Sequence, residues 1–266
     1  MSPWLETCRA AADDVRRVLG ELQGRAAREP VVGAGEGGDE TTAIDAAAEA
    51  VVVERLASTR RDFLLVSEEL GEKTFGRGGP TRIVLDPIDG SLNAKRGIPH
   101  FCLSIAVADG ATMRDVEFGY LYDFGSGEEW TATRGGGAFL NGAPLVGERP
   151  KDEIETLAFE ATLTSLVAEK ASAVVGLAYR LRIMGSLALA LCNLAAGRLD
   201  AVCSLKGARA VDIAAAQLLV RERDLAIELI EAPPLLDAPL DLEARSRVVA
   251  AGTPELCQRL AAALSA

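Results

Sequence analysis

The order of apolar segments along the chain is the feature that most constrains its fold. Two segments with helical spacing of apolar residues, 2–27 and 43–57, precede a series of short β-rich runs bounded by Gly, Pro and Asp. We expect these strands at residues 63–66, 82–85, 101–108, 116–122 and 129–132. An Asn-Gly pair near residue 141 then predicts a hairpin turn.

Beyond Pro150, predicted strands alternate with predicted helices. The strands are expected at residues 157–160, 199–203, 226–230 and 248–250. The helices are expected at residues 163–173, 186–196, 211–221 and 255–264. The first half therefore reads as α+β and the second as α/β, with units expected at residues 1–147 and 148–266.

The composition excludes several classes of function. His100 is the only histidine, so the chain cannot supply the two or three imidazoles of a His-rich zinc or iron site. No Gly-x-Ser-x-Gly elbow accompanies it for a Ser-His-Asp triad. A net charge of −11 argues against a nucleic-acid-binding surface, which recruits basic patches. Any hydrolytic chemistry must therefore use carboxylates, hydroxyls and hard metal ions.

The same composition indicates a soluble protein, which we expect in the cytoplasm. No apolar run approaches the about 18 residues of a membrane-spanning helix. The first 20 residues mix acids and arginines in an amphipathic pattern, unlike a signal peptide. The five cysteines are singly spaced, which argues against a disulfide framework and a Cys-x-x-Cys site.

One acidic motif stands out because an apolar strand runs directly into it. Residues 83–91 read IVLDPIDGS, and Pro87 is expected to end strand pairing because it lacks an N–H donor. Asp86 and Asp89 lie three apart across a tight turn. Both carboxylates can converge on one point, with the Ile88 carbonyl between them. Unpaired N–H groups after Gly90 favour an anion such as phosphate. Hard oxygen ligands beside a phosphate site are typical of Mg²⁺ binding.

Three further acidic elements occur in similar surroundings. Residues 64–69 read LLVSEE, residues 211–216 read VDIAAA, and residues 42–45 read TAID. Taken singly, each element has a plain structural explanation: a surface turn, a solvated loop, a helix cap or a helix-face charge. Their order along one chain is what favours a shared function.

That order resembles the inositol monophosphatase family of Mg²⁺-dependent, lithium-sensitive sugar phosphatases. Its first signature is similar to LDPIDGSLN at residues 85–93, and its second to VDIAAA. Its Thr-x-x-Asp, Glu-Glu and hairpin patterns match TAID, EE at residues 68–69 and GAFLNG at residues 137–142. NAKRGIP and RIMGS look most like the archaeal branch, which often hydrolyses inositol 1-phosphate and fructose 1,6-bisphosphate. The resemblance implies an α+β fold, a layered αβαβα sandwich of the sugar phosphatase type.

The resemblance also implies a set of metal ligands. Glu68, Asp86 and the carbonyl of Ile88 would hold a first Mg²⁺. Asp86, Asp89 and Asp212 would hold a second. A third, weaker ion would share Glu68 through water, and Mn²⁺ is a possible substitute. Because a phosphate dianion is repelled by a carboxylate-lined cleft, such ions are also what the charge balance requires.

Catalytic and substrate contacts follow from the same resemblance. Ser91 stands where the family usually has threonine and would orient the attacking water together with Asp45. Gly90 and Ser91 would contact the phosphate, and Gly185 and Ser186 match the Gly-Ser of the substrate loop. The role of Ser91 needs only a hydroxyl, so we expect a modest cost from the missing methyl group.

The substrate half departs from the family pattern. Ser204 replaces an acid that binds sugar hydroxyls, and Val211 replaces an aromatic residue before the signature Asp. Lys206 stands where archaeal relatives tend to have arginine. Arg182, Lys206 and Arg209 are candidates for binding a second phosphate, although ordinary surface bases explain them equally well.

These features together predict a Mg²⁺-dependent phosphomonoesterase acting on inositol 1-phosphate, fructose 1,6-bisphosphate or both. The alternatives are a 3′(2′)-phosphoadenosine or NADP-type nucleotide phosphatase and a catalytically silent relative. Family resemblance suggests a homodimer, and no nucleic-acid or membrane partner is expected. The loop at residues 76–80 is either a mobile element that delivers the third ion or a plain connector.

Overall fold

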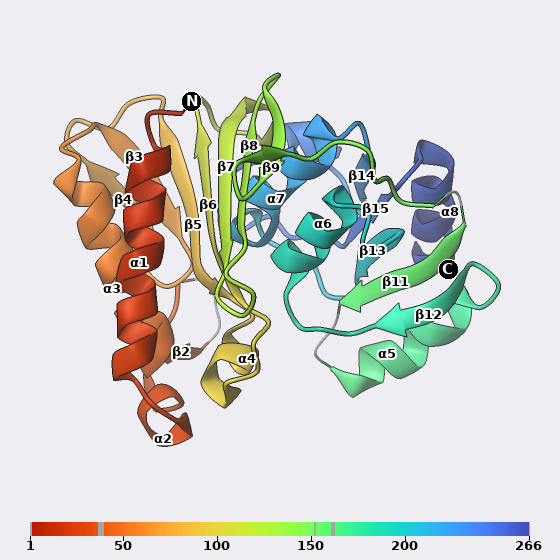
Figure 1. Ribbon diagram of the computed structural model, residues 1–266, viewed down its shortest axis with the longest axis horizontal. Helices are drawn as coiled ribbons and strands as arrows, with labels where there is room; N and C mark the ends of the chain where they lie inside the picture. Colours follow the sequence, from red (N-terminus) through yellow and green to blue (C-terminus); the bar gives the residue numbers. More distant parts are fainter. Residues whose placement is uncertain (1, 37–39, 152, 161–162, 266) are drawn as a thin grey trace.

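Helices and sheets alternate in five layers (Figure 1). The computed structural model describes residues 2–36, 40–151, 153–160 and 163–265. The helices of the layers are α1 (Leu5–Glu21) and α3 (Ala43–Ser58) on one outside, α6 (Leu187–Ala195) and α7 (Ala210–Glu222) in the middle, and α5 (Thr164–Lys170) and α8 (Pro254–Ser265) on the other outside. This arrangement confirms the expected αβαβα sandwich.

The first sheet has eight strands in the order β10-β9-β8-β7-β6-β5-β3-β4. They are β3 (Phe63–Ser67), β4 (Gly71–Phe75), β5 (Arg82–Asp89), β6 (Cys102–Ala108), β7 (Val116–Asp123), β8 (Glu129–Thr133), β9 (Gly137–Leu140) and β10 (Ala143–Pro144). All neighbours are antiparallel except β3 and β5, which are parallel, with Ser67 opposite Leu85. Because parallel strands end at the same edge of a sheet, the residues that follow β3 emerge beside the end of β5.

The second sheet has five strands in the order β12-β11-β13-β15-β14. They are β11 (Ile154–Glu160), β12 (Ala178–Arg182), β13 (Ala201–Ser204), β14 (Ala226–Leu229) and β15 (Val248–Ala251). In the parallel pair of β11 and β13, Glu160 lies opposite Ser204. Both residues therefore end their strands at the edge that faces the first sheet's acidic turn.

Shorter elements complete the chain. They are α2 (Arg25–Arg28), α4 (Ser91–Arg96) and the two-stranded sheet of β1 (Val31–Ala34) and β2 (Glu40–Thr42). Among the described residues, no helix is both long and apolar enough to cross a membrane.

The middle helices are buried because both sheets cover them. Ten of the thirteen residues of α7 are buried, and α7 contacts β5 to β8 on one side and β14 on the other. Every residue of β6 is buried as well, as expected for a strand covered on both faces. One hydrophobic core therefore joins both sheets through α6 and α7.

Most predicted elements occur within a few residues of their expected positions, with two informative differences. Pro87 was expected to end strand pairing, but β5 continues to Asp89 across an irregularity in its pairing with β6. Strands β4 and β12 were missed, since both are sheet edges with exposed residues and no clear alternation. The division into residues 1–147 and 148–266 stays a proposal, supported by the change of sheet between β10 and β11.

Candidate active site

A cavity of about 250 Å³ opens where the two sheets and the middle helices meet. Its lining draws acids from both halves of the chain: Glu68, Asp86, Asp89, Glu160 and Asp212. It also draws three bases from the second half: Lys206, Arg209 and Arg245. Four of the five acids are the predicted metal ligands, so the structure brings these four side chains into one pocket.

The parallel pair of β3 and β5 positions the first two acids. The Glu68 N–H donates to the Leu85 carbonyl at 3.3 Å, which holds the residue after β3 beside the end of β5. Asp86 is 2% exposed, and its carboxylate accepts the Ile88 N–H at 2.9 Å. Backbone hydrogen bonds therefore place both residues, through the N–H of Glu68 and the carboxylate of Asp86.

A bulge in β5 turns the next acid toward the middle helices. Pairing with β6 passes from Asp86 opposite Ser104 to Asp89 opposite Cys102, so β5 carries one extra residue there. Pro87 cannot donate a ladder hydrogen bond, which makes it compatible with the bulge. One oxygen of Asp89 accepts the Ala188 N–H at 2.9 Å, at the start of α6.

Ser186 contacts Asp89 and does not line the pocket. Its hydroxyl donates to the same Asp89 oxygen, and the side chain is buried. Gly185 does line the pocket, and a side chain on Gly90 would come within 3.1 Å of the Gly185 carbonyl oxygen. Gly90 also has φ +96°, so both its conformation and its surroundings require glycine. In this structure Ser186 is a positioning residue, in place of the substrate contact expected from the sequence.

The fourth acid, Asp212, lies in the first turn of α7 and pairs with the residue that begins the helix. The Arg209 N–H donates to Asp212 Oδ2 at 2.6 Å, which caps α7. The Arg209 side chain folds back onto the same carboxylate, with Nη2 3.0 Å from Asp212 Oδ1. Nη2 also lies 2.6 Å from Glu68 Oε1. Arg209 was one of three candidates for binding a second phosphate, but here two predicted metal ligands hold its guanidinium.

Burial and mutual repulsion raise the pKa values of the pocket acids. Burial raises the pKa of Glu68 to about 7, with Arg209 opposing the shift and Asp212 adding to it. The pKa of Asp86 is raised well above its usual range by burial and by Glu68, Asp89 and Asp212. Burial also raises the pKa of Asp89 to about 7 against the hydrogen bond from Ser186. The pocket therefore concentrates negative charge that its own contacts do not fully neutralise.

This donor set fits hard divalent cations. Carboxylate oxygens and the Ile88 carbonyl are the ligands that Mg²⁺ prefers, and a cation would relieve the repulsion among the acids. As they stand, the described side chains include no group of three or more acids, histidines or cysteines arranged to hold an ion. The acids thus share a pocket, but some must move to complete a coordination shell.

Ser91 and Asp45 do not form the expected pair. The Ser91 hydroxyl donates to the Ile88 carbonyl at 3.0 Å. Asp45 is buried and accepts the Thr42 N–H at 3.3 Å in the capping box of α3, and Lys95 Nζ lies 3.9 Å away. The second Asp45 oxygen, Oδ1, has no hydrogen-bond partner among the described residues. The difference arises because each group already has a partner within its own turn.

The basic residues of the pocket differ from the expected substrate site in two ways. Arg182 is exposed at the end of the edge strand β12 and does not line the pocket. Lys206 does line it, beside Arg245, which the sequence did not single out. Backbone hydrogen bonds between Ala208 and Ser246, at 2.7 and 3.1 Å, bring the two basic residues together.

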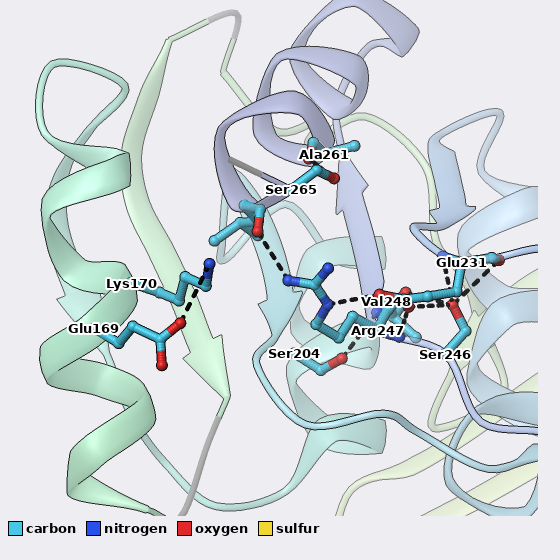
Figure 2. Close-up of polar contacts among 10 residues, drawn as sticks. Glu169, Lys170, Ser204, Glu231, Ser246, Arg247, Val248, Ala261 and Ser265 are labelled. Atoms are coloured by element: carbon cyan, nitrogen blue, oxygen red, sulfur yellow. Dashed lines mark hydrogen bonds and ion pairs between the residues drawn. The ribbon is translucent and has the colours of Figure 1, made fainter.

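The segment that carries Arg245 is anchored to the second sheet (Figure 2). Ser246 and Arg247 both bond to the Glu231 side chain, at 2.8 Å each. The Val248 N–H donates to the Ser204 hydroxyl at 2.8 Å. Ser204 itself lines the pocket. No sequence motif marks Arg245, because only this long-range pairing brings it to the site.

Glu160 is a second pocket residue that the sequence analysis missed. Its carboxylate accepts the N–H groups of Met184 and Gly185, at 3.3 and 2.8 Å. It thereby holds the loop that presents Ser186 to Asp89. The signal was present, since an apolar run ends in an acid here as it does at β3 and β5.

Comparisons with known proteins agree with this site. The model of the inositol monophosphatase family matches residues 4–266. The chain belongs to this family. A fructose-1,6-bisphosphatase/inositol-1-monophosphatase of Methanothermobacter thermautotrophicus is 32% identical over 267 residues, covering 97% of this chain and 95% of the relative. The chain is accordingly a phosphoric monoester hydrolase of the inositol monophosphatase type.

Other members of the inositol monophosphatase family support the fold and widen the comparison. A crystal structure of an inositol monophosphatase–fructose 1,6-bisphosphatase superposes with a TM-score of 0.84 at 27% identity, covering 98% of this chain and all of the other. The Nus factor SuhB of Escherichia coli is 37% identical over 193 residues, 69% of each chain. The family therefore also includes a relative that is named for a role other than catalysis.

The loop at residues 76–80 lies away from the site of this family member. Phe75 at the end of β4 pairs with Phe63 at the start of β3, whereas Glu68 follows the other end of β3. The Arg77 N–H and side chain bind Asp62, at 2.9 and 3.0 Å. The structure thus favours the plain connector over a loop that delivers a third ion.

Proposed function

We propose that the protein hydrolyses phosphate monoesters with Mg²⁺, or with Mn²⁺ as a substitute, and that inositol 1-phosphate and fructose 1,6-bisphosphate are its substrates. The observation that carries the proposal is the meeting of Glu68, Asp86, Asp89 and Asp212 in one pocket, although they span 145 positions of the chain. Mutual repulsion among buried carboxylates is costly unless cations compensate it.

Each wall of the pocket has a proposed role. The four acids and the Ile88 carbonyl would hold two or three ions. When bound, these ions neutralise charge on the phosphate and lower the pKa of water, which replaces a histidine base. Gly90 and Ser91 line the phosphate side. Ser91 would orient the attacking water with Asp45 once its hydroxyl leaves the Ile88 carbonyl that it contacts here. Asp45 Oδ1 is buried and has no hydrogen-bond partner among the described residues, so it could accept from such a group.

The basic wall favours a substrate with a second phosphate. Lys206 and Arg245 line the same cavity as the acids, and backbone hydrogen bonds between Ala208 and Ser246 hold the two segments that carry them. An arginine fork and a lysine point charge are suited to a phosphate dianion. This arrangement supports fructose 1,6-bisphosphate over a substrate with a single phosphate.

Asp89→Asn and Asp212→Asn test the proposed metal ligands. Each variant should lose phosphate release by more than about 100-fold, since even outer partners of metal ligands contribute 10–100-fold. Circular dichroism should show an intact fold, while the melting temperature of Asp212→Asn should fall because it loses the ion pair with Arg209. Asp237→Asn, an exposed acid paired with Arg114, is the matched control and should keep full activity. Full activity of either pocket variant would contradict the assignment.

A panel of substrates separates this proposal from its alternatives. Phosphate release from inositol 1-phosphate and fructose 1,6-bisphosphate should exceed release from 3′-phosphoadenosine compounds and NADP. The reverse order would favour a nucleotide phosphatase. Release from none of them, together with no Mg²⁺ binding by calorimetry, would favour a catalytically silent relative.

Three finer properties belong to the same proposal. Family resemblance supports a homodimer, inhibition by Li⁺ and a cytoplasmic location. Light scattering, an assay with added Li⁺ and cell fractionation would measure them in turn.

A further inference from the structure

We infer that Arg209 is a built-in counter-ion of the acidic pocket, which holds Glu68 and Asp212 in the metal-free protein and which divalent cations must displace. This inference rests on the metal site of the proposed function. It assigns to Arg209 a control over metal affinity in place of the phosphate contact expected from the sequence.

The guanidinium joins the two halves of the site. Glu68 follows β3 in the first sheet, and Asp212 belongs to α7 in the middle layer, which the second half of the chain contributes. Arg209 Nη2 contacts Glu68 Oε1 at 2.6 Å and Asp212 Oδ1 at 3.0 Å, and Nε lies 3.3 Å from Asp212 Oδ2. One nitrogen therefore bridges two acids that are 144 residues apart in sequence.

These ion pairs are shielded from water. The side chains of Arg209, Glu68 and Asp212 are 8%, 13% and 16% exposed. Burial lowers the pKa of Arg209, but Asp212 and Glu68 beside it outweigh burial and raise the pKa above its ordinary value. Removing one partner of such a buried pair leaves the remaining charge uncompensated, which is strongly destabilising.

The same oxygens are the ones that a metal would need. Asp212 Oδ2 already accepts the backbone N–H that caps α7, at 2.6 Å. An ion bound through Asp212 Oδ1 or Glu68 Oε1 must take over a position that Nη2 now contacts. Over the described part of the chain, no three acidic groups are yet arranged to hold an ion, as expected while a monovalent side chain separates two of them.

The displaced guanidinium would stay at the same cavity. The backbone of Arg209 stays fixed as the N-cap of α7, and its side chain lines the same cavity as Lys206 and Arg245. Metal loading would thus add a third positive group to the wall that faces an anionic substrate. The counter-ion stabilises the empty pocket and becomes available to substrate only when cations have replaced it.

Arg209→Met, compared with the wild-type chain by calorimetry with Mg²⁺ alone, tests this competition. The variant removes the charge but keeps most of the stem. We expect it to bind Mg²⁺ at least about tenfold more tightly, because no guanidinium has to be displaced. Its melting temperature in EDTA should fall by several degrees, and saturating Mg²⁺ should restore most of the loss.

Arg245→Met is the matched control, because it removes one positive charge from the same cavity lining without touching the cap of α7. Its Mg²⁺ affinity should change by less than about threefold, as expected for a through-space effect in a solvated cavity. An equal gain in Mg²⁺ affinity in both variants would overturn the inference, because any lost positive charge in the cavity would then explain it.

The remaining outcomes separate the inference from the function. Mg²⁺ binding with the same constant in Arg209→Met and wild type would overturn the inference alone. No Mg²⁺ binding by either protein would overturn the proposed function with it. If Arg209→Met does not fold in EDTA or in Mg²⁺, the Mg²⁺ affinity of Arg209→Lys is measured instead. A lysine offers a single point charge, so this variant should show an intermediate gain in affinity. An unchanged affinity in Arg209→Lys would then contradict the displacement.

Discussion

Gly90 shows how a single residue shapes the site. It lies at the junction of β5 and α4 with φ +96°, and a Cβ there would come within 3.1 Å of the Gly185 and His100 carbonyl oxygens. Gly97 closes the same helix at φ +72°, but a Cβ there would meet nothing within 4 Å. The two glycines therefore share the backbone conformation and differ only in their surroundings.

Gly90→Ala and Gly97→Ala separate strain from crowding. Both should lose about 1–3 kcal/mol from the left-handed conformation. Gly90→Ala should lose clearly more, because it also forces the acidic turn away from the substrate loop. Urea unfolding measures the stabilities, and phosphate release should fall in Gly90→Ala only. Equal losses of stability in the two variants would show that the close approach is unimportant.

The site acids could be located from the sequence because each follows an apolar run or opens an apolar helix, a local signal. The Ser91–Asp45 contact could not be judged in this way. Thr42 competes for Asp45, and the Ile88 carbonyl competes for Ser91. Arg245 had no local signal at all, since a pairing between distant backbone segments places it in the pocket.

At the scale of elements, one buried acid adds a polar contact to the hydrophobic packing of α1 on α3. Asp14 of α1 accepts a hydrogen bond from Arg55 of α3 at 2.7 Å and another from Arg17 on its own helix. The Arg55 hydrogen bond, the largest cause, lowers the pKa of Asp14 below its ordinary value of 3.8. A depressed pKa means that the ionised form stabilises the folded state above that value.

Asp14→Asn should therefore lower the free energy of unfolding at neutral pH by about 1 kcal/mol, discounted because Arg55 is partly exposed. The difference between wild type and variant should be full at pH 7 and should disappear as the pH falls through the lowered pKa. Denaturant unfolding along this pH series measures it. Asp13→Asn, whose partner Arg16 is exposed on the same helix, should show little change at any pH.

The bulge in β5 shows what element-level patterns leave out. The apolar run before Asp86 predicted a strand, and Pro87 predicted its end. Pairing instead resumes at Asp89 after one extra residue, because β6 continues alongside as a fully buried strand. Pairing with β6 therefore determines where β5 ends, and the sequence of β5 alone does not show which strand it pairs with.

At the scale of the whole molecule, the pocket combines two walls of opposite charge. Glu68, Asp86 and Asp89 come from the first half, whereas Lys206 and Arg245 come from the second. The second half also supplies Glu160 and Asp212, so both halves contribute acids to the pocket and only the second contributes bases. The relative position of the two halves sets the distance that a substrate must span.

Arg245→Met should therefore affect substrates unequally. We expect kcat/KM for fructose 1,6-bisphosphate to fall about tenfold or more through loss of a charge-assisted contact. The value for inositol 1-phosphate should change much less, because that substrate has no second phosphate. Steady-state kinetics on both substrates measures the ratio. Equal losses would mean that Arg245 contacts the phosphate that both substrates share, or that it is needed for the stability of the fold.

The middle helices have a consequence for how this chain can be divided. Helix α7 is encoded near residue 210, yet it covers β5 to β8 of the first sheet as well as β14. A cut between β10 and β11 would expose the apolar face of the first sheet that α7 covers. It would also expose the faces of α6 and α7 that pack on that sheet. Two such fragments should be insoluble when produced singly but should reconstitute when produced together, so the chain behaves as one cooperative unit under proteolysis or gene fission.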